Sequence, residues 1–302
     1  MSKLGVHALV WVGGWSEAEC ARAIRSTAEL GYDFIEIPLL NPYGFPVEFT
    51  RARLEEHGLG ATASLGLSAA TDISTEDPEA VRRGEDLLNT AVSVVRDLGA
   101  THFCGVIYSA LQKYMAPRTE RGVANIVEVL RRVAEKAHAS GITVGVEVVN
   151  RYETNVVNTA AEVVSLIGRI GQPNVYAHLD TYHMNIEEGF VGQAIEQCGD
   201  RIGYFHVGES HRGYLGTGTV DFTAVFRSLA RIGYDGPIAF ESFSSAVVDP
   251  VLSNMLGVWR NLWSDGYDLA GHAKAFMEAQ RLAAAHAVRA ERMSGGASRP
   301  GA

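Results

Sequence analysis

Cysteine and proline are scarce in this sequence. Among its 302 residues are three cysteines, Cys20, Cys104 and Cys198, and nine prolines. The cysteines are far apart and form no CxxC pair, which excludes a disulfide framework and a thiolate zinc site. We therefore expect the protein to reside in a reducing cytoplasm. The 32 glycines follow no short period, so a collagen-like chain is excluded as well.

Long apolar runs are also missing. Every apolar run is shorter than the roughly 18 to 20 residues that cross a bilayer, and charges or glycines interrupt each one. The first residues do not combine a basic region with an apolar stretch and a cleavage site, so we expect no export signal. The sequence thus predicts a protein that is neither inserted in a membrane nor exported.

Positive charge is in short supply. Twenty-six lysines and arginines face 35 aspartates and glutamates, which gives a formal net charge of −9. Such a surface repels polyanions and disfavours nucleic acid or an anionic membrane as the main partner. The chain is 47% hydrophobic and 20% charged, which is ordinary for a globular protein and leaves little room for extended disorder.

One short unit recurs along the chain. Several segments with helical spacing end in a glycine that is followed almost at once by a short apolar run; these glycines are Gly31, Gly58, Gly99, Gly141 and Gly233. Glycine fits the left-handed position just past a helix end, and β-rich residues after it are typical of a buried parallel strand. Other signals mark helix starts, since Ser16 with Glu19 makes a capping box and Asp221 can cap a later helix.

Eight strands with helices between them are predicted. They cover residues 5–11, 33–38, 60–66, 102–107, 142–149, 174–180, 202–207 and 237–242. Eight β-then-α units predict a single (β/α)₈ TIM barrel. A doubly wound open sheet is disfavoured, because no GxGxxG or Walker loop follows the first strand. We assign the barrel to residues 1–292 and expect a disordered tail over residues 293–302.

Four adjacent predicted strands end in residues that can bind a metal ion. Glu147, Asp180, His206 and Glu241 stand at the carboxyl ends of the fifth to eighth strands, and that end of a TIM barrel carries its chemistry. A lone polar residue at a strand end often only meets solvent. Three carboxylates and one imidazole on successive strands instead predict a site for Mn²⁺, Mg²⁺ or Co²⁺, whereas zinc is less favoured without thiolates.

Further polar residues follow in the loops after these strands. Glu153, His183 and Arg212 are suited to hydrogen-bond a polyhydroxylated ligand, although each taken alone is equally consistent with a solvated loop charge. His178 lies two residues before Asp180 and faces the same way, so it is either an interior histidine or a support for a carboxylate. Glu36, near the end of the second strand, is open to the same two readings.

The chain resembles a known family over nearly its whole length. The most specific blocks are residues 147–151, 179–188 and 206–212, together with residues 233–236 leading to Glu241. These blocks are similar to those of the ketose 3-epimerases, which include D-tagatose, D-allulose (D-psicose) and L-ribulose 3-epimerases.

The resemblance implies a (β/α)₈ barrel that binds Mn²⁺, with Co²⁺ or Mg²⁺ as substitutes, and that assembles as a homodimer or homotetramer. It implies metal ligands at the positions matching Glu147, Asp180, His206 and Glu241, and substrate contacts at those matching Glu153, His183 and Arg212. His7 and Ser64 stand at positions that vary within the family, and we expect both near the distal end of the sugar.

The expected reaction interconverts the C3 epimers of free ketoses, such as D-allulose and D-fructose, D-tagatose and D-sorbose, or L-ribulose and L-xylulose. One of Glu147 and Glu241 would remove the proton next to the C2 carbonyl, and the other would return one to the opposite face of a metal-stabilised cis-enediolate. An aldose–ketose isomerase or a polyol dehydratase on the same barrel is the main alternative. A DNA-repair nuclease is disfavoured by the charge of −9, and a sugar-binding protein without catalysis stays open.

Overall fold

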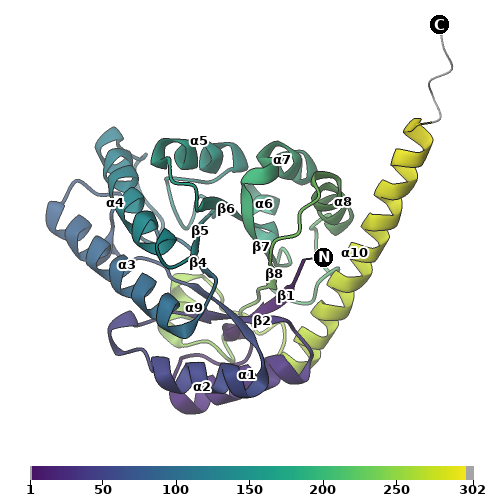
Figure 1. Ribbon diagram of the computed structural model, residues 1–302, viewed down its shortest axis with the longest axis horizontal. Coiled ribbons are helices and arrows are strands. Elements are labelled where there is room, and N and C mark those ends of the chain that lie inside the picture. The colour runs from purple at the N-terminus through teal and green to yellow at the C-terminus, as the bar shows by residue number, and fades with distance from the viewer. Residues whose placement is uncertain (1, 297–302) are drawn as a thin grey trace, which may run out of the picture.

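Eight parallel strands close into a barrel in the computed structural model, which describes residues 2–296 (Figure 1). Each strand pairs with the next along the chain, and the last pairs with the first. The strands are β1 (Leu4–His7), β2 (Phe34–Pro38), β3 (Gly60–Ser64), β4 (His102–Cys104), β5 (Thr143–Glu147), β6 (Val175–Asp180), β7 (Ile202–Val207) and β8 (Ile238–Phe240). The predicted TIM barrel is therefore confirmed.

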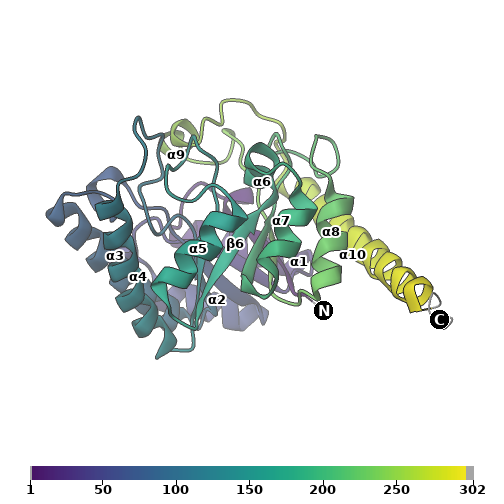
Figure 2. The same ribbon diagram turned by 90° about the horizontal axis from the view of Figure 1, so that it is seen from above.

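Helices surround the barrel, and two short ones lie over one end of it. The helices are α1 (Glu17–Glu29), α2 (Val47–His57), α3 (Pro78–Leu98), α4 (Glu120–His138), α5 (Ala160–Ile170), α6 (Thr181–Glu187), α7 (Val191–Cys198), α8 (Phe222–Ile232), α9 (Pro250–Met255) and α10 (Gly266–Gly296). Short 3₁₀ turns are η1 (Ala8–Val10), η2 (Pro42–Gly44), η3 (Ala69–Thr71) and η4 (Gly199–Arg201). Figure 2 shows α6 and α9 on the same side of the barrel, and α6 directly follows the carboxyl end of β6.

The glycines that the sequence predicts at helix ends are found there. All five of the glycines singled out have positive φ angles, between 61° and 72°, and three of them are the left-handed C-caps of α2, α3 and α8. At the start of α1, the Ser16 amide donates to Glu19 Oε2 at 2.9 Å, which completes the predicted capping box. Asp221 caps α8 by accepting the Ala224 amide at 2.9 Å.

Several predicted boundaries are wrong; the strands expected to end at residues 107, 149 and 242 end at Cys104, Glu147 and Phe240, and two further differences have a visible cause. The first strand ends at His7 rather than at residue 11, because His7 Nδ1 accepts the Leu9 amide at 3.3 Å and turns the chain into η1. At the other end, α10 continues to Gly296, four residues into the segment expected to be disordered, and extends beyond the barrel in Figure 1. Its distal part is tied to α8 by Arg231, whose guanidinium donates to Glu291 at 3.0 and 3.1 Å. Residues 297–302 lie outside the described residues.

The inside of the barrel changes from apolar to polar toward the carboxyl ends of its strands. Phe34 and Tyr204 belong to one apolar cluster in the interior. Side chains two residues apart on a strand face the same way, so the next inward positions on β2 and β7 are Glu36 and His206. The Tyr204 hydroxyl joins the two layers, since it lies 2.8 Å from Glu36 Oε2 and 2.7 Å from Thr62 Oγ1. The fold thus holds a buried polar layer where the site begins.

Across residues 2–296, no helix combines the length and the apolar character that a bilayer crossing requires.

Two helix glycines make a matched pair of stability tests. A Cβ atom on Gly84 of α3 would lie 2.3 Å from the Thr71 carbonyl oxygen, whereas one on Gly168 of α5 would meet nothing within 4 Å. Alanine favours a helix over glycine by about 0.5–1 kcal/mol. We expect Gly168→Ala to raise the free energy of unfolding by up to that amount, and Gly84→Ala to lower it by about 1–3 kcal/mol through overpacking. Urea denaturation of both variants tests this, and equal shifts of the same sign would contradict it.

Candidate metal centre and active site

The four predicted metal ligands come together at the carboxyl end of the barrel. Glu147 and Asp180 are the last residues of β5 and β6, His206 is the last but one of β7, and Glu241 directly follows β8. One ligand atom from each lies within 4.8 Å of the others, and all four side chains are buried. The parallel strands place them together because their carboxyl ends share one rim.

This cluster fits a divalent cation. His206 Nδ1 is buried and has no hydrogen-bond partner among the residues that the structure describes. It faces Glu147 Oε1 at 3.6 Å and Glu241 Oε1 at 3.5 Å. An imidazole nitrogen turned toward carboxylate oxygens, with no bond of its own, is a free ligand position. Three carboxylates and one imidazole form a donor set for Mn²⁺ or a similar ion.

Glu36 supports this histidine from the other side. Its Oε2 atom accepts a hydrogen bond from His206 Nε2 at 2.6 Å and another from the Tyr204 hydroxyl at 2.8 Å. A proton held on Nε2 leaves Nδ1 of the neutral ring as the ligand atom. The sequence left Glu36 open, and its only signal was an acidic residue on the inward face of a strand near its end.

The charges of the cluster are unevenly distributed. Burial raises the pKa of Glu147 to about 8, and burial also raises the pKa of Asp180. Burial acts in the same direction on Glu241, but the charges of His206 and Arg212 outweigh it and hold the pKa of Glu241 below its ordinary value. Although burial opposes it, the carboxylates of Glu36 and Glu241 hold the pKa of His206 well above its ordinary value. Without a cation, protons therefore occupy part of this site.

Cation binding is expected to displace those protons. At pH 7 we expect Mn²⁺ to release on the order of one to two protons per ion, because His206 Nδ1 and Glu147 must both be deprotonated to act as ligands. The release should fall as the pH rises above about 8, where Glu147 is already ionised. Titration calorimetry in two buffers of different ionisation enthalpy measures the proton count. Binding without proton release at pH 7 would show that the ion sits elsewhere.

Arg212 lies beside the cluster and offsets its negative charge. Its Nη1 atom donates to Glu241 Oε2 at 2.6 Å and to Asp180 Oδ2 at 3.3 Å. The guanidinium carbon lies 3.7 Å from the centroid of the Tyr182 ring, which fixes the plane of the group. The side chain is 6% exposed, so its charge acts in a medium that screens it little.

Asn150 links the other two predicted substrate contacts. Its backbone amide donates to His183 Nδ1 at 3.1 Å, and its side-chain amide donates to Glu153 Oε1 at 2.8 Å. Burial lowers the pKa of His183 well below its ordinary value, so the ring is neutral and carries its proton on Nε2. Burial raises the pKa of Glu153 to about 7. No pattern in the sequence marks Asn150 as a functional residue.

His7 and Ser64 form a hydrogen-bonded pair at 3.3 Å. His7 Nδ1 already accepts the Leu9 amide, and burial lowers the pKa of His7. The neutral ring therefore carries its proton on Nε2 and donates it to Ser64 Oγ. This arrangement leaves the Ser64 hydroxyl hydrogen free to donate to a ligand.

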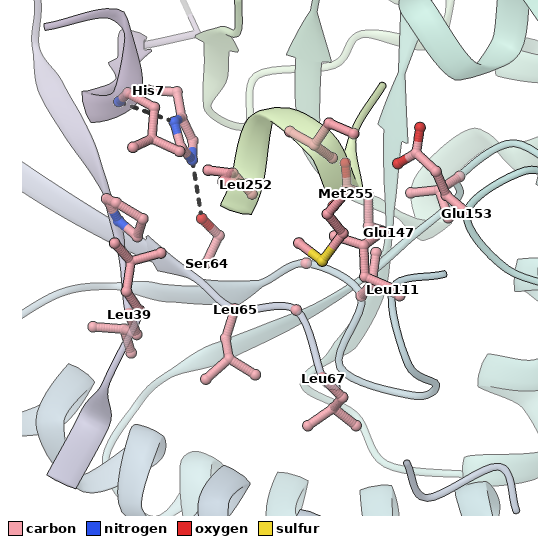
Figure 3. A pocket seen from close by; sticks show the side chains of 18 of the residues that line it. His7, Leu39, Ser64, Leu65, Leu67, Leu111, Glu147, Glu153, Leu252 and Met255 are labelled. Atoms are coloured by element: carbon pink, nitrogen blue, oxygen red, sulfur yellow. Dashed lines mark hydrogen bonds between the residues drawn. The ribbon is translucent and has the colours of Figure 1, made fainter. Parts of the chain in front are cut away.

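One cavity of about 450 Å³ unites these groups. All the predicted site residues line it except Asp180, which is fully buried. Figure 3 shows Glu147 and Glu153 on one side and the His7–Ser64 pair on the other. The rest of the wall is largely apolar and includes Leu39, Leu65, Leu67, Leu111, Leu252 and Met255. The size suits a small organic ligand, and the polar groups gather where the strands end.

Comparisons with known proteins identify the family of this chain. A family profile described as a xylose isomerase-like TIM barrel matches residues 24–269. The ketose 3-epimerase of Arthrobacter globiformis is 54% identical over 275 residues, which cover 91% of this chain and 95% of the relative. The L-ribulose 3-epimerase of Methylomonas sp. (strain DH-1) is 53% identical over 274 residues, which cover 91% of this chain and 96% of the relative.

A solved structure of a related enzyme has the same fold as this chain. The crystal structure of D-allulose 3-epimerase from Methylomonas sp. in complex with D-allulose superposes on this chain with a TM-score of 0.91. It is 52% identical and covers 92% of this chain and 97% of its own. The chain belongs to the xylose isomerase-like TIM barrel family and, within it, to the ketose 3-epimerases.

Proposed function

We propose that this protein interconverts the C3 epimers of free ketoses in a metal-dependent reaction. The observation that carries the proposal is a pair of buried carboxylates, Glu147 at the end of β5 and Glu241 directly after β8. Both face His206 Nδ1 and both line the cavity. The relatives named ketose, L-ribulose and D-allulose 3-epimerases support the same reaction. Free ketoses such as D-allulose, D-tagatose and L-ribulose are the proposed substrates.

Epimerisation at C3 removes a proton next to the C2 carbonyl and returns one to the opposite face. Two groups that exchange acid and base roles suffice for this, provided that one serves each face. We assign these roles to Glu147 and Glu241, which reach the cavity from non-adjacent strands of the barrel. Which of the two removes the proton then depends on the configuration at C3 of the bound sugar.

Glu147, Asp180, His206 and Glu241 would hold the cation, for which we propose Mn²⁺, with Co²⁺ or Mg²⁺ as substitutes. A divalent ion in that place supplies positive charge that stabilises the negative charge developing on the substrate oxygens.

The remaining polar groups orient the sugar. The Nε2–H group of His183 can donate to a sugar oxygen, and Glu153 can accept a hydroxyl hydrogen once it is ionised. Arg212 adds a fixed positive charge beside Glu241, at 2.6 Å. Ser64, oriented by His7, donates on the far side of the cavity. The apolar wall excludes water from the reacting end, which strengthens each of these polar interactions.

We also propose that the protein assembles as a homodimer or homotetramer and resides in the cytoplasm. Several large apolar side chains at the carboxyl end of the barrel are exposed, including Tyr43 at 67% and Trp259 at 74%. Aromatic side chains are enriched in protein interfaces, which supports a homodimer or homotetramer. Three free, buried cysteines are consistent with the reducing cytoplasm.

Proton and carbon NMR in D₂O tests the reaction. Metal-stripped protein is incubated with D-allulose, D-fructose and L-ribulose, with and without added Mn²⁺. We expect deuterium at C3 together with the C3 epimer, and only when the metal is present. Exchange at C1 with aldose formation would identify an aldose–ketose isomerase, and loss of water would identify a dehydratase. Saturable binding without any exchange would leave a sugar-binding protein.

A further inference from the structure

A further buried carboxylate, Glu209, lies near the site and takes no part in the proposed chemistry. Glu209 follows β7 by two residues and is 0% exposed. Within residues 2–296 it forms no ion pair, and its partners are three backbone amides and the Ser210 side chain. Its Oε1 atom accepts the amides of Ser210 at 2.8 Å and Val220 at 3.3 Å, and its Oε2 atom accepts the Gly216 amide at 2.9 Å. One side chain therefore ties together the beginning, the middle and the end of the loop between β7 and α8.

The loop follows a path that fits closely around this carboxylate. Gly216 has a φ of +82°, in the left-handed region. A Cβ atom on Gly218 would lie only 2.4 Å from Glu209 Oε1, so the backbone there approaches the carboxylate as closely as glycine permits. Backbone bonds to Glu209 outweigh the effect of burial and lower its pKa, so the carboxylate is ionised. A charged acceptor makes stronger bonds to amides than a neutral one does.

The same loop carries Arg212 in a conformation that needs support. Arg212 has a φ of +60°, and it is the only residue other than glycine with a positive φ among those that the structure describes. Such strained residues persist when their surroundings determine the conformation. The Arg212 amide donates to the Glu209 carbonyl at 2.9 Å, and Ser242 Oγ donates to the Arg212 carbonyl. This backbone conformation places the guanidinium over Tyr182 and within reach of Asp180 and Glu241.

We propose that Glu209 is a positioning residue for the epimerase: by binding the loop amides it holds Arg212 in its left-handed conformation and so aims the guanidinium at the catalytic cluster. The inference rests on the proposed function, because it assigns Glu209 a role in that reaction. Glu209 touches neither the cavity nor the four candidate metal ligands, and it acts only through the loop.

Glu209→Gln removes the charge and keeps the shape. The amide group of glutamine cannot accept hydrogen bonds on both ends, so at least one of the three loop amides loses its partner. We expect kcat/KM for D-allulose in the Mn²⁺-loaded protein to fall roughly 10- to 100-fold, the order of loss that misplacing a group by about 1 Å causes. Glu196→Gln is the matched control, since Glu196 lies on α7, bonds to Ser228 and Arg231, and should leave kcat/KM unchanged.

A double-mutant cycle with Arg212→Ala separates positioning from a general structural effect. If Glu209 acts through Arg212, the Glu209→Gln change should lower kcat/KM less than about twofold once Arg212 is gone. Added guanidinium ion should restore activity to the same degree in Arg212→Ala and in the double variant, because a free ion needs no loop to hold it. If the rates of the Arg212→Ala and double variants are too slow to measure alone, their rates with added guanidinium are compared instead to complete the double-mutant cycle.

The outcomes distinguish the two levels of the proposal. A wild-type protein that does not epimerise D-allulose contradicts the proposed function. An active wild type in which Glu209→Gln causes the same fold-loss with and without Arg212 contradicts the positioning role, and so does guanidinium that rescues only the single variant. A Glu209→Gln variant with unchanged kcat/KM overturns it as well. Thermal unfolding and Mn²⁺ content, measured for every variant, confirm that each is folded and loaded.

Discussion

Glu147→Gln and Glu241→Gln are each expected to abolish epimerisation at C3, lowering kcat by at least about 10²- to 10⁴-fold, the usual contribution of a general acid or base. Glutamine keeps the size of the side chain and can still offer an oxygen to a cation, but it cannot take up or deliver a proton. In each variant, one face of C3 is left without the group that removes or returns its proton. The measurement is the initial rate of D-allulose conversion, followed together with deuterium incorporation at C3 in D₂O.

The interpretation depends on metal content, because both glutamates are also candidate ligands. Variants that keep Mn²⁺ but lose turnover separate the proton-transfer role from ligation, and metal analysis of the purified proteins decides this. Glu196→Gln on the surface of α7 is the matched control and should retain full activity. Epimerisation retained in both active-site variants would contradict the two-base scheme and assign the proton transfers to other groups in the cavity.

Much of the fold was predictable because the barrel repeats one local pattern. A glycine after several of the helices and a short β-rich run after that glycine are local signals, and the structure places all five of these glycines at positive φ as expected. The errors lie where a contact overrides the pattern. The apolar residues after His7 are typical of a continuing strand, but the His7 ring caps the next turn. The composition after Met293 suggests disorder, but α10 has already been fixed against α8 and its last turns continue to Gly296.

The candidate ligands were predictable for a similar reason. Each stands at the end of its own strand, and parallel strands bring their carboxyl ends together without further information. Glu36 was not predictable in the same way. It meets His206 across the interior of the barrel, 170 residues apart in sequence, and β2 and β7 are not neighbours. Whether two inward side chains on distant strands meet depends on the stagger of the closed barrel, which no local pattern encodes.

The loop residues of the site were also not predictable from the sequence. Asn150 and Glu209 form hydrogen bonds to other site residues or to backbone amides, and none to the candidate ligands. A sequence shows only that a polar residue is present, and a solvated loop position has the same composition as a buried support. Glu209 is 0% exposed although it lies in a loop, and only the folded path of residues 210–220 explains why.

Glu36→Gln is expected to lower the affinity for Mn²⁺ by about 10- to 100-fold, the effect of removing the carboxylate that supports a metal-binding histidine. The Glu36 carboxylate accepts a hydrogen bond from His206 Nε2 at 2.6 Å and so keeps His206 Nδ1 turned toward Glu147 and Glu241. A neutral amide makes the imidazole a weaker electron donor to the metal than a carboxylate does. The amino group of the glutamine would also be buried without a hydrogen-bond acceptor. Because Glu36 acts on the metal ligand His206, to which it is hydrogen-bonded, kcat at saturating Mn²⁺ should change far less than the affinity does.

Titration of metal-stripped protein with Mn²⁺, followed by calorimetry, gives the affinity without relying on activity. Tyr204→Phe is the informative partner variant, because it removes the second hydrogen bond to Glu36, at 2.8 Å, and leaves the carboxylate on His206 in place. We expect it to weaken Mn²⁺ binding less than Glu36→Gln does. An unchanged affinity in Glu36→Gln would mean that His206 is oriented by its packing alone, and an equal loss of affinity in both variants would mean that the hydroxyl, rather than the charge, holds the buried layer in order.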